Sequence, residues 1–168
     1  MRLISIEIEQ RMKFLGYYQI IGGIVGLYMI ISSFILVQAF GGLQFLFYFI
    51  AFGLFAFSIY SGNLLRIENI KGIKYSNWVQ ISQVLQVSFI GFSFGYSSGI
   101  EFSLGFHLTE VFRPDASLNF SNFIIVYSPQ DKGEFFMFIN FVPLVLIYLL
   151  GDLEKKIEER KRLFAENE

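Results

Sequence analysis

The sequence predicts an α-helical integral membrane protein with four transmembrane helices and a short extracytoplasmic β-hairpin-like insertion between the third and the fourth. Three observations lead to this fold class. Only 16% of the 168 residues are charged and 54% are hydrophobic, whereas a soluble domain is about a quarter charged. Three stretches, 14–65, 75–100 and 135–151, contain no charged residue. Lys and Arg are concentrated in the segments that flank these stretches.

The first charge-free stretch is long enough for two helical spans, since one helical crossing of a bilayer needs about 20 apolar residues. Its only plausible break is Gly41-Gly42. We therefore expect spans at 14–37 and 43–61, joined as an antiparallel hairpin. The apolar run 14–37 exceeds the roughly 7–15 residues of a signal-peptide core, so we expect an uncleaved anchor.

The two later charge-free stretches predict a third span at 78–97 and a fourth at 134–151. The segment 98–133 between them would be an outer loop, and 152–168 would continue the fourth helix as a charged cytoplasmic tail. All of these elements belong to a single membrane domain, 1–168.

The orientation follows from the positive charges. Only two of the 13 Lys and Arg residues, Arg113 and Lys132, fall in the expected outer loop. Short cytoplasmic segments carry the excess of Lys and Arg, and four spans place all the other cationic residues on one side. We therefore expect a bacterial cytoplasmic (inner) membrane protein with both termini in the cytoplasm. Three spans would export the basic tail.

Residues 90–109 carry a conflicting pattern. Even positions are mostly large and apolar and odd positions mostly Gly, Ser or polar, which is typical of a half-buried strand. In one interpretation 78–97 is a helix, and only 100–109 pairs with the β-rich run 118–127 around an Arg113-Pro114-Asp115 turn. In the other, strand begins near Phe92 and there is no third span. A lone strand cannot cross lipid, so the second interpretation leaves three spans and exports the basic tail. The charge distribution therefore favours the first interpretation.

An apolar face on such a hairpin must be covered. The residues concerned are Phe102, Leu104, Phe106 and Leu108. Helix ends, the lipid surface or the hairpin of a neighbouring subunit could cover them.

Small and polar residues within the expected spans are candidates for helix association or for lining a pore. Glycines spaced four apart let helix backbones approach closely, and amides in a span usually bond another helix. The residues are Gly22, Gly26, Gln80, Gln83, Gln86, Gly91, Ser93, Gly95, Ser97, Gly99 and Asn140.

Three residues of the outer loop, Glu101, His107 and Glu110, are further candidates. On a strand Glu101 and His107 share a face, where a weak metal site or a pH-sensitive contact is conceivable. A solvated polar face opposite the apolar one explains them more simply.

Several functional classes are disfavoured. No charged residue lies well inside an expected span, which argues against ion-coupled transport. With no Cys and one His a structural zinc site is not expected. We find no catalytic constellation, cofactor motif or metal site, and the net charge of −1 gives no indication of nucleic-acid binding.

The sequence thus favours a non-enzymatic membrane subunit, anchor or sensor. It would act in the lipid bilayer through helix association, as a homo-oligomer or with a partner membrane protein. The alternative is an oligomeric pore lined by the Gln, Ser and Gly face of the expected third span.

Overall fold

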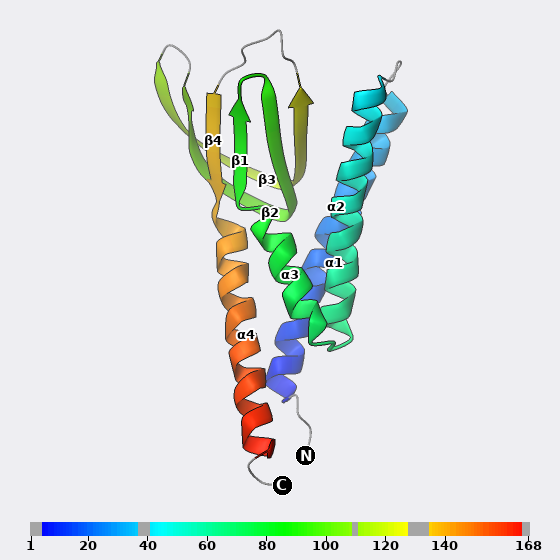
Figure 1. Ribbon diagram of the computed structural model, residues 1–168, viewed down its shortest axis with the longest axis vertical. Helices are drawn as coiled ribbons and strands as arrows, with labels where there is room; N and C mark the ends of the chain where they lie inside the picture. Colours follow the sequence, from blue (N-terminus) through cyan, green and yellow to red (C-terminus); the bar gives the residue numbers. More distant parts are fainter. Residues whose placement is uncertain (1–4, 37–40, 109–110, 128–134, 166–168) are drawn as a thin grey trace.

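The computed structural model describes residues 5–36, 41–108, 111–127 and 135–165 (Figure 1). The described elements follow the order α1 (Ile6–Leu36), α2 (Gly42–Arg66), α3 (Lys71–Ile81), β1 (Leu85–Phe89), β2 (Phe92–Leu108), β3 (Phe112–Tyr127), β4 (Phe135–Asn140) and α4 (Phe141–Ala165). The expected fold of four transmembrane helices is wrong. Two of the described helices are long and apolar enough to cross a membrane, and the strands form one four-stranded antiparallel sheet.

The two long helices are α1 and α2, which contain the predicted spans 14–37 and 43–61, apart from residue 37, which lies outside the described residues. They pack as a hairpin whose backbones touch at glycines. A Cβ added to Gly16 would lie 2.6 Å from the carbonyl oxygen of Gly62. About half of the apolar side chains of this pair are exposed, so the hairpin has a narrow seam and a wide apolar surface.

The expected third span, 78–97, does not exist as a helix. Its residues form the end of α3, all of β1 and the start of β2. The strands β1 and β2 are joined by a two-residue turn, Ile90-Gly91, with φ of 46° and 74°. Positive φ at both central residues is the type I′ geometry that tight hairpins prefer. The alternation of large and small residues therefore reports a strand, and the interpretation that begins it near Phe92 is correct.

The expected hairpin is present but longer than predicted, because β2 and β3 pair from Phe92↔Tyr127 to Leu108↔Phe112. The segment expected as an outer loop, 98–133, is thus largely sheet within its described part. Arg113-Pro114-Asp115 lies inside β3 and is not the turn. Proline is tolerated there because β3 is an edge strand, paired with β2 alone, and edge strands have backbone positions that need no donor.

The expected fourth span, 134–151, is divided between β4 and the first turns of α4, with residue 134 outside the described residues. Figure 1 shows β4 running directly into α4 as one column. The tail is helical up to Ala165, as expected. Leu153 and Ile157 of this tail are buried in an apolar cluster with residues from α1, α2 and α3.

The sheet curls upon itself. The first half of β2 pairs with β1, its second half pairs with β4, and β1 also pairs with β4. This ring of pairings requires β2 to bend, and the register between β2 and β3 shifts between Ser97 and Ile100. Gly99 lies at the bend with φ of +105°, a conformation that glycine adopts without strain.

The two sides of the curled sheet have reversed polarity. On the outer side Phe102 and Leu104 are each 43% exposed, whereas on the inner side Glu101 is 1% exposed and Ser103 is fully buried. A sheet with one solvated face normally turns its apolar face to the core and its polar face to water. Over 100–104 of β2 the apolar residues face outward and the polar residues face inward.

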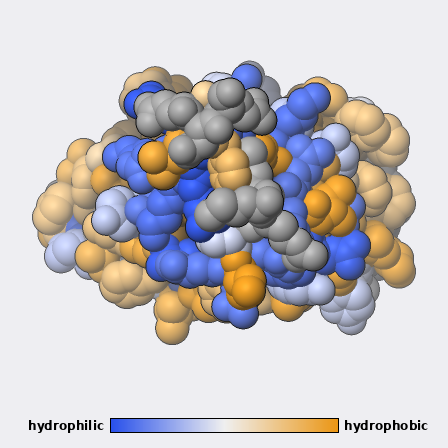
Figure 2. Space-filling view, turned by 90° about the horizontal axis from the view of Figure 1, so that it is seen from below, coloured by the Kyte–Doolittle hydropathy of each residue, from blue (hydrophilic) through white to orange (hydrophobic). Residues whose placement is uncertain are grey.

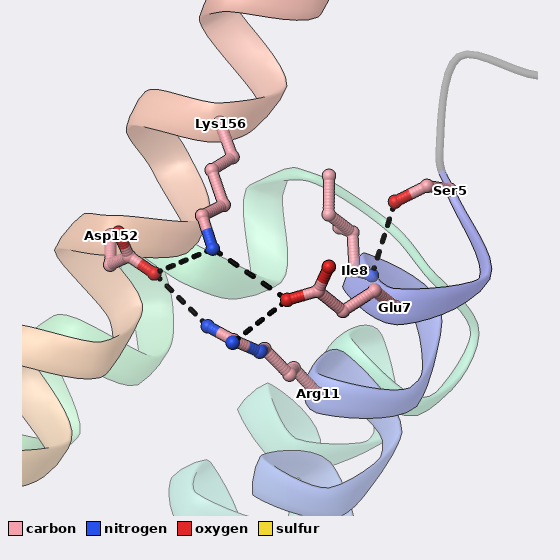
Figure 3. A network of polar contacts seen from close by, with 6 residues as sticks. All are labelled: Ser5, Glu7, Ile8, Arg11, Asp152 and Lys156. Carbon is pink, nitrogen blue, oxygen red and sulfur yellow. Dashed lines mark hydrogen bonds and ion pairs between the residues drawn. The ribbon is translucent and has the colours of Figure 1, made fainter.

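The start of α1 and the end of α4 lie at one end of the molecule, away from the sheet (Figure 1). At this end Arg11 of α1 contacts Asp152 of α4 at 3.1 Å, and Lys156 contacts Glu7 at 3.7 Å (Figure 3). Seen from this end, hydrophilic residues gather over the middle and hydrophobic residues over the two flanks (Figure 2). The molecule therefore has one charged end and apolar sides.

We expect Gly22→Ala to destabilise the fold by about 1–3 kcal/mol, the usual cost of overpacking. A Cβ at position 22 would lie 2.5 Å from the backbone nitrogen of Gly99, so α1 and β2 would have to separate. The measurement is the free energy of unfolding in detergent. Gly53→Ala is the matched control, because position 53 of α2 has nothing within 4 Å of the added Cβ. It should be neutral or slightly stabilising; equal losses in both variants would contradict the packing described here.

Candidate functional site

The helical hairpin meets the sheet at a polar contact, where α1 crosses the bend of β2. The Ser121 hydroxyl of β3 donates to the carbonyl oxygen of Gly22 and accepts from the backbone N–H of Gly99, both at 3.0 Å. Three chain segments are thus joined by one hydroxyl. The absence of a side chain at Gly22 lets the two backbones come this close, and a Cβ at Gly99 would meet the ring of Tyr18.

A second buried network ties the helices together below this contact. The side-chain oxygen of Gln19 on α1 accepts from Ser61 on α2 at 2.9 Å and from Ser76 on α3 at 3.0 Å. The Ser58 hydroxyl lies 3.2 Å from the backbone oxygen of Gln19 and 2.9 Å from the hydroxyl of Ser98 on β2. All five side chains are buried. The network therefore fixes α1, α2, α3 and β2 relative to one another.

The three predicted glutamines do not share a helix face, because Gln80 lies on α3, Gln83 follows it and Gln86 lies on β1. All three are nevertheless buried. Gln83 accepts from the backbone N–H of Ser98 at 2.8 Å and donates to the carbonyl of Val79 at 3.1 Å. Both amide atoms of Gln80 and the nitrogen of Gln86 are buried without a hydrogen-bond partner among the described residues.

The polar inner side of the sheet is centred on Glu101. One carboxylate oxygen, Oε1, accepts from the hydroxyls of Ser103 and Ser117 and from the amide of Asn119, each at 3.3 Å. The other oxygen, Oε2, is buried and has no partner among the described residues. A buried carboxylate that is half satisfied carries a substantial desolvation cost.

Two further polar side chains at the bend and at the base of the sheet have unpaired atoms. Asn140, at the β4–α4 junction, accepts from the backbone N–H groups of Phe102 and Val142 at 3.2 Å. Its amide nitrogen and the Ser97 hydroxyl are buried without a partner among the described residues. Asn140 pairs in register with Ser103, which bonds Glu101.

His107 lies farther out on the same side of β2, close to the hairpin tip. Its Nε2 is 3.6 Å from a carboxylate oxygen of Asp115, and its ring packs against Phe136 and Phe138 at 5.7 and 5.3 Å. Glu110 lies outside the described residues. No group of three or more His, Cys, Asp or Glu residues that could hold a metal ion occurs within the described ranges.

The predicted glycines and Ser93 take several places in the chain. Gly26 faces the ring of Phe55, and Gly91 forms the β1–β2 turn. Gly95 lies against the side chain of Gln86, and the Ser93 hydroxyl is 2.7 Å from that of Ser88. Each of these contacts lies within the one chain.

Sequence reasoning missed the network around Gln19 and the partners of Glu101. Gln19 could have been found, because it is the one amide within the apolar run 14–37. The serines could not, because nothing in a lone serine shows whether it faces lipid or another segment.

No family model matches the chain, and neither a curated protein nor a solved structure matches it. The features that bear on function are therefore the polar interior, the exposed apolar surface and the charged end.

We expect Gln19→Leu to destabilise the protein by about 1–3 kcal/mol, because it removes the acceptor for two buried hydroxyls. A double-mutant cycle with Ser76→Ala, followed by unfolding in detergent, isolates the contact. We expect the double variant to be more stable than the sum of the single changes predicts, by about 0.5–2 kcal/mol. Strict additivity would show that the two side chains do not bond.

Proposed function

We propose that the protein is an integral membrane protein that acts non-enzymatically, as an anchor or subunit whose hairpin and sheet both lie within the bilayer. The observation that carries the proposal is the reversed polarity of the sheet. Outward-facing residues such as Ile100, Phe102, Leu104 and Leu118 are exposed on the described chain. An apolar surface of this extent is unfavourable in water and marks a membrane or protein contact.

The lengths of the elements fit a bilayer whose hydrocarbon core is about 30 Å thick. Residues 14–36 of α1 rise about 35 Å at the helical rise per residue. The six residues of β4 rise about 20 Å, and the apolar start of α4, 141–150, adds about 15 Å. Because β4 and α4 form one column (Figure 1), a strand followed by a helix spans the same depth as α1.

Backbone pairing supports the same placement, because unpaired backbone groups are not tolerated in hydrocarbon. The pairings among β1, β2 and β4 form a closed ring. The second half of β3 lies against α1 through Ser121 and Gly22. The start of β3, 112–115, has an open edge that carries Arg113, Pro114 and Asp115. This edge therefore belongs at the headgroup level.

The charged end belongs at the opposite membrane surface. Ion pairs join Arg11 to Asp152 and Lys13 to Glu68 there, so α1, α4 and the α2–α3 connection share one end. All but two of the 13 Lys and Arg residues lie in the segments that meet there or in the terminal segments beyond them. The excess of Lys and Arg favours the cytoplasmic side for this end.

A pore lined by the segment 78–97 is not supported, because that segment is not a helix and its glutamines point into the interior of one chain. Gly22 and Gly26 likewise contact their own chain. The proposed role therefore uses the outer apolar surface, in contact with lipid.

Single-cysteine labelling tests the topology, since the native chain has no Cys. In sealed cells a membrane-impermeant maleimide should label Asp115→Cys from outside and Glu154→Cys only after permeabilisation. Leu118→Cys, 75% exposed on the outer side of the sheet, should react only with a lipid-soluble maleimide or in detergent. The cysteine-free wild type is the control. If the impermeant reagent labels Leu118→Cys as fast as Asp115→Cys, the sheet lies in water and the proposal is wrong.

The single tryptophan provides a second measurement without mutation. Trp78 is 58% exposed on α3, one turn beyond Lys74, and tryptophan favours the membrane interface. Its fluorescence in vesicles should be quenched more strongly by a lipid with a shallow nitroxide than by one with a deep nitroxide. If neither lipid quenches the fluorescence of Trp78, α3 lies outside the membrane.

A further inference from the structure

We propose that the polar interior of the sheet binds one small monovalent cation, best matched by Na⁺, at the carboxylate of Glu101. This assignment goes beyond the proposed membrane role and does not depend on it. Glu101 is 1% exposed, and no Lys or Arg of the described residues forms an ion pair with it. Buried charges in proteins are as a rule paired or coordinated to a metal ion.

The carboxylate is already oriented for a ligand. Its Oε1 is held by Ser103, Ser117 and Asn119, which fixes the plane of the group. Its Oε2 is buried and has no partner within the described part of the chain. One oxygen is thus anchored, and the other is the buried atom that the proposed cation would neutralise.

Two hydroxyl oxygens lie beside this carboxylate. The hydroxyls of Ser103 and Ser117 are each 3.3 Å from Oε1, and the third contact at that distance is the amide nitrogen of Asn119. A hydroxyl has lone pairs as well as a proton, so each serine can bind a cation by a small rotation. Oxygen ligands of this kind suit hard cations, and among the described residues the hydrogen-bond partners of Glu101 include neither sulfur nor imidazole.

The single negative charge selects a monovalent ion. Na⁺ with one carboxylate makes a neutral buried pair, whereas a divalent ion would leave one uncompensated positive charge in the interior. Asp115 is the next carboxylate along this side of the hairpin, but it is exposed, and its oxygen faces His107. A divalent site would favour at least three acidic or imidazole ligands, and no such group occurs among the described residues.

The same side of the hairpin offers a route from the surface. Along β3 the residues Asp115, Ser117 and Asn119 alternate onto the side that carries Glu101, as the contacts to its carboxylate show. Asp115 and Asn119 are exposed and Ser117 is half-buried. A cation attracted by Asp115 at the tip therefore meets polar oxygens along the strand before it reaches Glu101.

Thermal unfolding of the purified full chain in detergent tests the site. The midpoint in NaCl is compared with that in N-methyl-D-glucamine chloride at the same ionic strength, over a range of concentrations. Binding to the folded state alone raises stability with the logarithm of ligand concentration. We expect Na⁺ to raise the midpoint by about 2–8 °C, and ²²Na⁺ equilibrium binding to approach one ion per chain.

Two substitutions and one control locate the effect. Glu101→Gln keeps the shape of the side chain but removes its charge, and it should abolish the Na⁺ response. Ser117→Ala removes one neutral ligand and leaves the carboxylate, so that the Na⁺ concentration for half-saturation should rise about fivefold, the equivalent of one hydrogen bond. Ser88→Ala is the matched control, because that buried hydroxyl bonds Ser93 and should leave the response as in the wild type.

Three outcomes would overturn the assignment. Equal midpoints in Na⁺ and in N-methyl-D-glucamine for the folded wild type would show that no Na⁺ site exists. A midpoint that varies with pH but not with Na⁺ would show that the carboxylate takes a proton instead. Stronger stabilisation by Ca²⁺ than by Na⁺ at equal concentration would show that the charge argument is wrong.

Discussion

The close contact between α1 and the bend of β2 is the constraint on which the rest of the structure depends. A side chain at Gly22 would collide with the backbone of Ser98 and Gly99, and the Ser121 hydroxyl bridges the same two segments. Because β2 is the strand that pairs with all the others, its position against α1 fixes the whole sheet. The networks of Gln19 and Gln83 then hold α2 and α3 around that point.

A bend in β2 also explains why the polarity of the sheet is reversed. Where three strands close a ring, the inner side is narrow and accepts small side chains, and the outer side accepts large ones. The odd positions of β2 supply Gly95, Ser97 and Ser103 to the inside, and Gly105 leaves room for the ring of Phe138. At the even positions of β2, Phe102 and Leu104 face outward, whereas Tyr96 is buried and packs against Phe55 of α2. Outward-facing aromatic side chains are favourable in the bilayer proposed above.

Several parts of this arrangement could be predicted from the sequence. The charge-free run 14–65 defines the helical hairpin, and the alternation over 90–109 defines β2. The prediction of helical spans at 78–97 and 134–151 was wrong for a physical reason. A charge-free stretch shows that its residues avoid water, and it does not show whether they are helical. The 17 residues of the stretch 135–151 are few for a transmembrane helix. They cover a greater length when six of them form a strand, as in β4 followed by α4.

The candidate site was harder to predict from the sequence than the fold. Glu101 could be singled out as a charged residue in a strand with an apolar face, but a polar face opposite an apolar one normally indicates solvent. Its burial depends on the curl of the sheet, which follows from the pairing of β1 with β4. Pairing between strands separated by some 50 residues of chain is a long-range property that local patterns do not encode.

Glu101 is also the exception within the narrow interior of the sheet. Its neighbours on the inner side of β2 are Gly and Ser, so a long charged side chain there is favoured neither by space nor by solvation. The three weak donors on Oε1 offset part of the desolvation cost, and Oε2 leaves the remainder uncompensated. A serine in place of Glu101 would fit the inner side with a smaller desolvation penalty. A carboxylate in this position is therefore understandable as the ligand of a cation, and the fold alone gives no reason for it.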